Sequence, residues 1–417
     1  MNIPVEIVSK IFEKLELKDF LVASRACKKF HDVINAKIFV KQIIVNFKQP
    51  DVFKVSVRKY SNMKIENVNE TEVLTIINFL KSHKNFAKSI TNLRIFDCTV
   101  SDPNLIVDLL QYFDNLKELY LESVSVKVTS VVASPIQLQF KLHKLKILSF
   151  LYSENILLTN IVELMSKLEI FKLCLLPFLN DQTKTFYYKI IKTILQNNCK
   201  TLRKLNLYEV NFDDQFLRQI SDIDFKALNK FSMSFNSYLS GSSGFLSFIT
   251  SQSKNLEKFK INTFDHVNDE KLQILIEHLP QLKNLNIIVC CHCDYSQLKN
   301  FHNLVNLEKL KIQPKQFCSM EDDSRSFNFL IGNIVLEYVN DSMKSLTILC
   351  LKISNEIIRK LINNFPNLEF LNLSYATSMK TEHIYLMKDQ LKYLKKLIID
   401  ECIFIDNKNT LMISSTL

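Results

Sequence analysis

The chain has 417 residues, of which 47% are hydrophobic and 23% are charged, and its formal net charge at pH 7 is +10. A chain of this length forms either several domains or an elongated repeat architecture, because single hydrophobic cores stop growing at roughly 250–300 residues. Only three glycines occur, Gly241, Gly244 and Gly332, so the sequence contains neither a GxGxxG stretch nor a Walker-type loop. Nucleotide-binding α/β folds are therefore disfavoured, since their phosphate sites depend on such glycines.

The hydrophobic residues are interrupted by a charged or amide residue every few positions. No run approaches the ~20 residues that a membrane-spanning helix requires, so we expect a soluble protein that does not bind a membrane. The first apolar segment contains Glu6, Lys10, Glu13 and Lys14, which a secretory signal would not tolerate. Ten cysteines without regular spacing indicate a reducing compartment, and we expect the protein in the cytoplasm, the nucleus or both.

Residues 1–39 contain three short apolar stripes at helical spacing. The stripes are Ile7, Val8, Ile11, Phe12 and Leu15, then Phe20, Leu21, Ser24 and Cys27, then Phe30, Val33 and Ile34. Pro4 is suited to begin the first helix, because its fixed φ is compatible with a first helical turn. Three helices this short have little interior of their own, so their exposed apolar side requires a partner.

The same residues resemble the F-box family, whose pattern is Leu-Pro-x-Glu-Leu, then Ile-Phe, then Leu-x-Leu-x-Asp-Leu, and finally Cys-Lys/Arg-x-Trp/Phe. The matching residues are Ile3 to Ile7, Ile11 with Phe12, Leu15 to Leu21, and Cys27 to Phe30. The sequence departs from the pattern in having Ile3 for the first leucine, and in having Phe30 and Phe39 at the usual aromatic places without any tryptophan.

The resemblance implies that this segment binds the Skp-family adaptor of a cullin–RING ubiquitin ligase. The adaptor-binding residues that it implies are Ile3, Pro4, Glu6, Ile7, Ile11, Phe12, Leu15, Leu21, Cys27 and Phe30. An alternative is that these apolar residues only cap the N-terminal end of a repeat array, which needs a cap in any case.

A template with apolar residues at relative positions 1, 4, 6, 9 and 11 recurs twelve times in the rest of the chain. The copies start at Ile90, Leu116, Leu145, Leu168, Leu202, Leu228, Leu256, Leu282, Leu307, Leu346, Leu368 and Leu394. Eleven steps cover 304 residues, about 28 per step, which is close to the 20–29 residues of a leucine-rich repeat. The chain therefore resembles the leucine-rich-repeat family over residues 90–404, and a degenerate copy begins at Tyr60.

Template positions 4 and 6 lie on one face of a short strand, whereas positions 3, 5 and 7 lie on the other. Residues 71–86, 104–113 and 269–279 show helical spacing. Stacked copies predict an α/β fold in which the N-terminal three-helix segment is followed by a curved solenoid, with parallel strands on its concave face and helices on its convex face.

Other segments connect these parts. Residues 40–89 join the first segment to the repeats, and residues 405–417 form a C-terminal tail. Two steps are long, 34 residues after Leu168 and 39 residues after Leu307, and the second contains residues 313–326, for which we expect a loop at one rim. We interpret GSSG, residues 241–244, as a flexible loop.

Residues 287–294, IIVCCHCD, suggest a metal site. Cys290 occupies template position 9, as do Cys98 and Cys402, and the repeat explains these cysteines as small buried residues. Cys291, His292 and Cys293 follow without a second ligand pair at zinc-like spacing. We therefore expect no metal and no cofactor.

The concave face is predicted to be basic. Ten residues at template positions 3, 5 and 7 are basic: Arg94, Lys172, Lys204, Lys230, Lys258, Lys260, Lys309, Lys311, Lys352 and Lys396. Three are acidic: Glu118, Glu122 and Asp400. The excess predicts binding of an acidic or phosphorylated segment of a protein substrate, and the alternative is a lysine-rich composition spread over solvated faces.

The predicted substrate-binding residues are Arg94, Phe96, Tyr120, Lys204, Tyr208, Lys258, Lys260, Lys309 and Lys311. Phe96, Tyr120, Ile147 and Leu151 come from neighbouring copies and predict an apolar patch, unless the packing of the sheet shields them.

An adaptor-binding segment followed by a long recognition surface is the order found in F-box substrate receptors. The resemblance implies a non-catalytic substrate-recognition subunit of an SCF-type E3 ubiquitin ligase, whose partners are a Skp-family adaptor, a cullin scaffold and a protein substrate. The alternative is a leucine-rich-repeat interaction scaffold without a link to ubiquitin. Nucleic-acid binding is disfavoured because 53 basic and 43 acidic residues are interleaved, and catalysis because neither HExxH nor a nucleophile signature is present.

Overall fold

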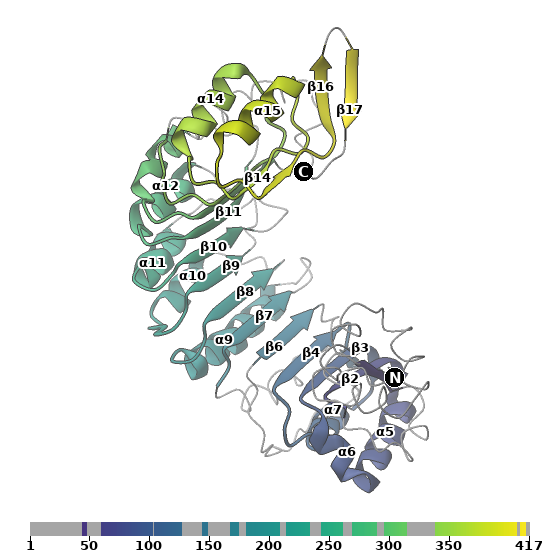
Figure 1. The fold of residues 1–417 in the computed structure, drawn as a ribbon. Coiled ribbons are helices and arrows are strands. Elements are labelled where there is room, and N and C mark those ends of the chain that lie inside the picture. The colour runs from purple at the N-terminus through teal and green to yellow at the C-terminus, as the bar shows by residue number, and fades with distance from the viewer. Residues whose placement is uncertain are drawn as a thin grey trace, which may run out of the picture. The chain divides into compact units, whose positions relative to one another are not determined.

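The computed structural model describes residues 44–47, 60–102, 104–126, 144–148, 167–174, 181–208, 214–233, 243–261, 269–289, 296–314, 338–406 and 409–413. The chain divides into two compact units, Met1–Asn198 and Cys199–Leu417, and each unit is described by itself. In both units, parallel strands alternate along the chain with helices (Figure 1). The predicted α/β class with a parallel sheet is therefore confirmed.

The N-terminal unit contains a parallel sheet whose strands lie side by side in chain order. Its strands are β1 (Ile44–Asn46), β2 (Asn62–Asn69), β3 (Asn92–Val100), β4 (Glu118–Glu122), β6 (Lys144–Leu148) and β7 (Ile170–Cys174), and the short β5 (Ser125–Val126) pairs with β3. Its helices are α5 (Glu70–Ser82), α6 (Lys84–Ser89), α7 (Asn104–Leu110) and α9 (Asp181–Asn198).

The C-terminal unit repeats the same plan. Its parallel strands are β8 (Lys204–Tyr208), β9 (Lys230–Met233), β10 (Lys258–Ile261), β11 (Asn284–Val289), β12 (Lys309–Pro314), β13 (Ser345–Ile348), β14 (Phe370–Asn372) and β15 (Lys396–Ile398). Its helices are α10 (Asp214–Ser221), α11 (Ser243–Gln252), α12 (Asp269–His278), the 3-10 helix η2 (Ser296–Asn303), α14 (Asn355–Asn364) and α15 (Thr381–Gln390). An antiparallel hairpin, β16 (Cys402–Asp406) and β17 (Asn409–Ile413), follows the last parallel strand.

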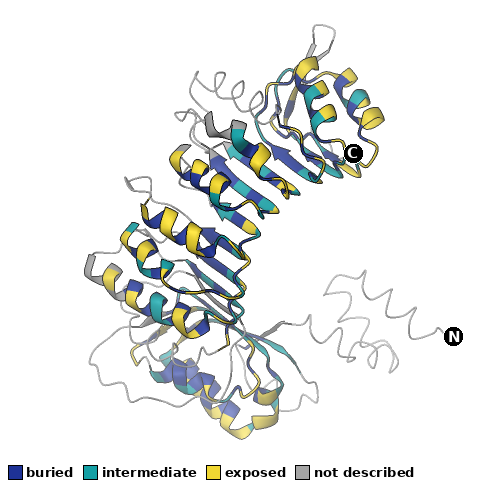
Figure 2. Ribbon diagram, turned by 90° about the vertical axis from the view of Figure 1, so that its left-hand side faces the viewer, coloured by how far each residue is buried: buried dark blue, intermediate teal, exposed yellow. Residues whose placement is uncertain are grey.

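Side chains at template positions 4 and 6 form the core between the strands and the helices. Phe231 of β9 packs against Phe248 of α11 with ring centroids 4.7 Å apart, and Phe259 of β10 lies 6.1 Å from Phe245. Figure 2 shows the helices presenting buried residues on one side and exposed residues on the other. Positions 3, 5 and 7 consequently point away from the helices, and this side of each sheet is called the open face below.

A recurrent backbone pattern locks neighbouring copies in register. The carbonyl at template position 2 accepts hydrogen bonds from the N–H groups at positions 2 and 3 of the next copy. Glu257 O thus accepts from Lys283 N at 2.8 Å and from Asn284 N at 3.1 Å, and Lys283 O accepts from Glu308 N and Lys309 N at 2.9 Å each. Each strand therefore begins at the same height as the strand before it.

A second ladder uses the amide residue that precedes template position 1. Asn255 Nδ2 donates to Phe225 O at 3.0 Å, and Asn367 Nδ2 donates to Asp341 O at 2.9 Å. Asn115 and Asn306 make equivalent bonds to the preceding copy. These bonds satisfy turn carbonyls between copies, and the recurring Asn-Leu pair is the sequence signal that would have predicted them.

The predicted helical segments and the degenerate copy are confirmed. Residues 71–86 fall in α5 and α6, residues 104–113 contain α7, and residues 269–279 contain α12. The copy that begins at Tyr60 contains β2, in which Met63 lies opposite Leu93. The strand β1 was not predicted from the sequence; it pairs with β2 and adds one more strand to the N-terminal side of the sheet.

Two of the twelve predicted starts are wrong by three residues. Leu145 lies opposite Leu119, and Leu346 lies opposite Leu310, so each occupies template position 4 rather than position 1. The error arose because apolar residues recur every three positions in both segments, which fits either register. Ile147 therefore occupies template position 6, opposite Leu121, and the buried Ile348 belongs to the helix-facing side of the sheet, not to the open face. In the corrected register, Lys352 likewise no longer occupies template position 3, 5 or 7.

The first residues of α11 correct the interpretation of GSSG as a loop, because Ser243 and Gly244 lie inside the helix. Asp214, the first residue of α10, accepts hydrogen bonds from Gly244 N at 2.6 Å, Ser243 Oγ at 2.7 Å and Arg218 Nη2 at 2.9 Å. Burial would raise the pKa of the Asp214 carboxyl, but these hydrogen bonds hold it below its ordinary value. A Cβ on Gly244 would lie 1.9 Å from Asp214 O, so glycine here permits close helix packing.

Candidate functional site

Several predicted features lie outside the described residues. They include all ten adaptor-binding residues, Ile3, Pro4, Glu6, Ile7, Ile11, Phe12, Leu15, Leu21, Cys27 and Phe30. They also include residues 315–326 of the predicted insertion, Leu151, and the cysteine-rich stretch 290–293. The adaptor-binding residues therefore remain predictions from the sequence.

Six lysines gather on the open face of β8 to β12 in the C-terminal unit. They are Lys204, Lys230, Lys258, Lys260, Lys309 and Lys311, here called the lysine face. Lys230 lies opposite Lys258, whereas Asn286 separates Lys260 from Lys311 in the strand order. Five of these lysines were predicted to bind substrate, and Tyr208, also predicted, ends β8 beside them.

The lysines of this face lie close enough to influence one another. The pKa of Lys260 is lowered from its ordinary value by burial, by Lys311 and by Lys230, in that order. Among the described residues at template positions 3, 5 and 7 of β8 to β13, none is acidic. Within the part of the chain that the structure describes, the lysine face therefore concentrates positive charge without an acidic residue at the same strand positions.

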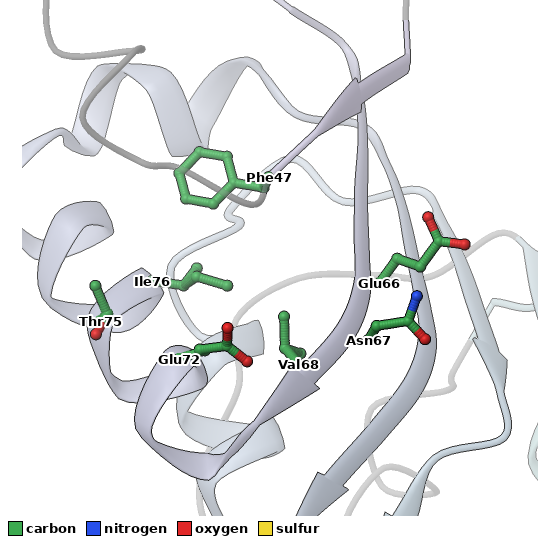
Figure 3. A pocket seen from close by; sticks show the side chains of 7 residues that line it. All are labelled: Phe47, Glu66, Asn67, Val68, Glu72, Thr75 and Ile76. Atoms are coloured by element: carbon green, nitrogen blue, oxygen red, sulfur yellow. The ribbon is translucent and has the colours of Figure 1, made fainter.

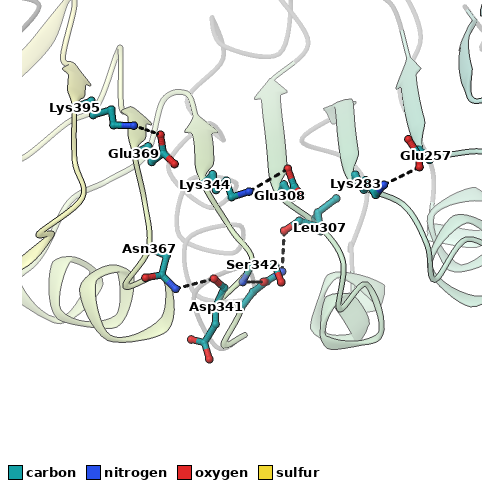
Figure 4. A network of polar contacts seen from close by, with 11 residues as sticks. Glu257, Lys283, Leu307, Glu308, Asp341, Ser342, Lys344, Asn367, Glu369 and Lys395 are labelled. Carbon is teal, nitrogen blue, oxygen red and sulfur yellow. Dashed lines mark hydrogen bonds and ion pairs between the residues drawn. The ribbon is translucent and has the colours of Figure 1, made fainter.

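Three glutamates of the C-terminal unit form ion pairs with lysines outside the lysine face. Template position 2 alternates in sign across β10 to β15, through Glu257, Lys283, Glu308, Lys344, Glu369 and Lys395 (Figure 4). Their ion pairs measure 2.7 Å for Glu257 with Lys283, 3.6 Å for Glu308 with Lys344, and 2.6 Å for Glu369 with Lys395. The hydrogen bond from Lys395 and the charge of Lys395 lower the pKa of Glu369. The hydrogen bond to Glu257 and the charge of Glu257 raise the pKa of Lys283. These carboxylates already have lysine partners outside the lysine face.

Polar side chains are buried at template position 5 between the lysines. Asn206 and Ser232 are only 3% and 1% exposed, and they lie opposite each other in β8 and β9. Asn206 Oδ1, Ser232 Oγ and Asn286 Oδ1 are buried and have no hydrogen-bond partner in the described part of the chain. Buried polar atoms are normally satisfied, so these three indicate a place that a ligand or water completes. Sequence reasoning missed them because Asn and Ser are common on exposed strand faces, so their residue types do not indicate that they are buried.

The open face of the N-terminal unit brings together three other predicted residues. The Arg94 guanidinium lies 5.0 Å from the ring centroid of Tyr120, and Lys64 lies 4.9 Å from that of Phe96. Lys64 also pairs with Glu66 at 2.8 Å. Each aromatic ring thus has a cation over its face, which is a cation–π arrangement. Sequence reasoning missed Lys64, because this residue lies in the degenerate copy that begins at Tyr60 and not in one of the twelve regular copies.

The corrected register places two basic residues at template positions 3 and 5 of β6. Lys144 occupies template position 3 and Lys146 position 5 of β6, opposite Glu118 and Tyr120. Lys146 in turn lies opposite Lys172 of β7. Basic residues therefore continue along template position 5 of this unit.

A pocket of about 200 Å³ lies beside β2 and α5 (Figure 3). It is lined by Phe47, Glu66, Asn67, Val68, Glu72, Thr75 and Ile76. The Glu72 carboxylate accepts a hydrogen bond from Asn69 N at 2.9 Å, and Glu72 N donates to Asn69 Oδ1 at 3.1 Å. Glu72 therefore belongs to the capping box that begins α5.

The buried cysteines at template position 9 behave as the repeat predicts. Cys98 and Cys402 are fully buried, and burial followed by the charge of Glu72 raises the pKa of Cys98 to about 12. No group of three His, Cys, Asp or Glu side chains within the described ranges could hold a metal ion. No helix in those ranges is long and apolar enough to cross a membrane.

The described residues define a class of protein built from stacked strand–helix repeats with a cationic open face. Residues 1–44 match the F-box-like family, which confirms at the family level the resemblance drawn from Ile3 to Phe30. No curated protein sequence matches the chain significantly.

Two solved structures show similarity to this chain. One is a chain from a crystal structure of the TLR13–ssRNA13 complex, with 16% identity, a TM-score of 0.45, and coverage of 88% of this chain and 53% of that chain. This chain thus spans about half the length of the TLR13 structure's chain. The other is a chain from a crystal structure of the yeast Rad7 and Elc1 complex, with 15% identity, a TM-score of 0.47, and coverage of 97% and 90%.

Proposed function

We propose that this chain is a substrate-recognition subunit of an SCF-type E3 ubiquitin ligase. Its N-terminal segment binds a Skp-family adaptor, and the open face of its leucine-rich repeats binds a protein substrate for ubiquitin-dependent degradation. The observation that carries the proposal is the F-box-like match at residues 1–44, followed by a long repeat with a lysine-rich open face.

The physical basis is proximity rather than chemistry by this chain. A receptor that holds a substrate lysine near a ubiquitin-charged enzyme converts an encounter between molecules into an effectively intramolecular one. The receptor then needs a docking segment and a recognition surface, and it needs no catalytic group of its own. The role of residues 1–39 follows from their apolar stripes, which are too small to form a stable core alone.

Co-purification of the adaptor and a cullin with the full chain tests the proposal. We expect Ile11→Asp combined with Leu15→Asp to abolish adaptor binding, because both changes place a charge in the apolar stripe. Leu74→Asp is the matched control, since Leu74 is 43% exposed on α5 and should leave adaptor binding intact. Failure of the unaltered chain to bind the adaptor would leave the interaction scaffold as the better description.

Salt dependence tests the proposed acidic character of the substrate. Contacts between the lysine face and a negatively charged segment should weaken markedly between ~50 and ~300 mM salt, because the Debye length shortens over this range. Substrates identified by mass spectrometry under a proteasome block would supply the ligand. Affinity that stays constant over this range contradicts an electrostatic recognition surface.

A further inference from the structure

Four side chains lie in one row across β9 to β12. Ser232, Lys260, Asn286 and Lys311 all occupy template position 5, and each lies directly opposite the next in the strand register. Neighbouring strands are ~4.8 Å apart, so Lys260 and Lys311 begin roughly 10 Å apart on either side of Asn286. Lysine side chains are long and flexible enough for both ammonium groups to reach one ligand that lies over the shorter asparagine.

The row concentrates positive charge that no carboxylate among the described residues pairs with. Burial, Lys311 and Lys230 all lower the pKa of Lys260, so three cations act on one partly buried site. No carboxylate forms an ion pair with Lys260 or Lys311 in the described ranges, because the position-2 glutamates pair with Lys283, Lys344 and Lys395. An anion placed here would relieve the repulsion between the lysines.

The row also contains polar atoms that lack partners. Ser232 Oγ and Asn286 Oδ1 flank Lys260, and both are buried without a hydrogen bond in the described part of the structure. The Ser232 hydroxyl can donate to an oxygen of a ligand. Rotation of the Asn286 amide presents its N–H group in place of its oxygen, because the two orientations have nearly the same shape.

We infer that this row binds the phosphate of a phosphorylated serine or threonine in the substrate, with the phosphate over Asn286 between Lys260 and Lys311. The inference rests on the proposed function and specifies the substrate class of the same face. A phosphate carries nearly two negative charges and three acceptor oxygens, which match the two lysines, the Ser232 hydroxyl and the Asn286 amide. A carboxylate has one charge and two oxygens, so it satisfies fewer of these groups.

A peptide fits the face better than a nucleic acid does. Single-stranded nucleic acids are bound by basic grooves that also offer aromatic rings on which bases stack. None of the described residues at template positions 3, 5 and 7 of β9 to β13, the strands around the row, is aromatic, and Tyr208 of β8 lies outside this range. The surrounding polar residues instead suit an extended peptide that places one phosphate in the row.

Binding to degenerate peptide libraries tests the inference. The full-length chain is incubated with three immobilised libraries whose central residue is phosphoserine, aspartate or serine, and bound peptides are then measured singly by fluorescence anisotropy. We expect the phosphoserine library to be preferred. Lys260→Gln and Lys311→Gln should each weaken the selected phosphopeptides by at least about tenfold, which is about 1.4 kcal/mol. Lys352→Gln is the matched control, because Lys352 is exposed outside the row.

Three results would overturn the inference. Equal binding of the serine and phosphoserine libraries would show that phosphate is not read. Unchanged affinity of Lys260→Gln and Lys311→Gln would place the phosphate elsewhere. A single-stranded RNA oligonucleotide that binds as tightly, with the same dependence on Lys260, would indicate a nucleic-acid site. Thermal unfolding of each variant establishes that it is folded.

The proposed function can fail separately from this inference. Adaptor binding depends on Ile11 and Leu15, whereas phosphopeptide binding depends on Lys260 and Lys311. Phosphopeptide binding without adaptor binding would refute the ubiquitin-ligase role alone. Adaptor binding without phosphopeptide binding would refute the phosphate site alone.

Discussion

Substitution of Gly244 by alanine has two opposite effects on stability: it raises the helix propensity of α11, and it introduces a steric clash between α11 and α10. Alanine is favoured over glycine in a helix interior by about 1 kcal/mol, which is an upper bound for Gly244 as the second residue of α11, so propensity alone predicts a slightly more stable helix. The structure predicts the reverse, because the new Cβ would lie 1.9 Å from Asp214 O and 2.8 Å from Asp214 C. Both contacts are with backbone atoms, so α10 and α11 must move apart and strain the hydrogen bonds from Gly244 N and Ser243 Oγ to Asp214.

Overpacking of this kind costs typically about 1–3 kcal/mol, which exceeds the gain in propensity. We therefore expect Gly244→Ala to lower the local free energy of unfolding. Hydrogen exchange read by mass spectrometry over α10 and α11 measures this change directly, whereas a global melting curve of two units need not be two-state. Thr250→Ala, at an exposed site of the same helix, is the control and should be neutral or slightly stabilising. Equal or greater protection in Gly244→Ala would refute the packing argument.

Three further predictions concern polar contacts of the C-terminal unit. Hydrogen bonds hold the Asp214 pKa below its ordinary value of 3.8, so they contribute stability that is full above the unfolded pKa and is lost as the pH falls through the lowered folded value. Asp214→Asn should flatten the loss of stability below about pH 4 in acid unfolding curves, and an unchanged slope would contradict this. Asn340→Ala should cost about 1–3 kcal/mol in chemical denaturation, because buried Asn340 Nδ2 donates to Leu307 O at 3.0 Å. Asn367→Ala should cost less, because the hydrogen bond from Asn367 Nδ2 to Asp341 O is exposed, and an equal cost would refute the role of burial. Glu308→Gln should cost under about 1 kcal/mol at low salt and almost nothing at 1 M salt, and a salt-independent loss would argue against an electrostatic cause.

Much of the fold could be predicted from the spacing of apolar residues. A strand buried on one face and a helix packed behind it require regular periods, and those periods are visible from Ile90 to Leu394. Register failed where Leu145 and Leu346 had apolar neighbours three residues away on both sides. In such segments only the pairing with the adjacent strand decides which residues face the core.

The candidate site was predictable in its charges but not in its hydrogen-bonding groups. Lys260 and Lys311 follow from template position and residue type alone. Ser232 and Asn286 required knowledge of burial, since an unpartnered oxygen is a property of the assembled sheet. Gly244 shows the same limit, because its neighbour Asp214 lies thirty residues away in the sequence, and only the packed helices reveal why a side chain is excluded.

The alternation of glutamate and lysine at template position 2 constrains how the repeat number can change. Loss of one copy between Glu257 and Lys395 would place two like charges side by side, whereas loss of two adjacent copies would restore an opposite pair. Recombination that shortens or lengthens this array is therefore favoured in steps of two. The alternating charges at template position 2 therefore favour an even number of copies in any deletion or insertion.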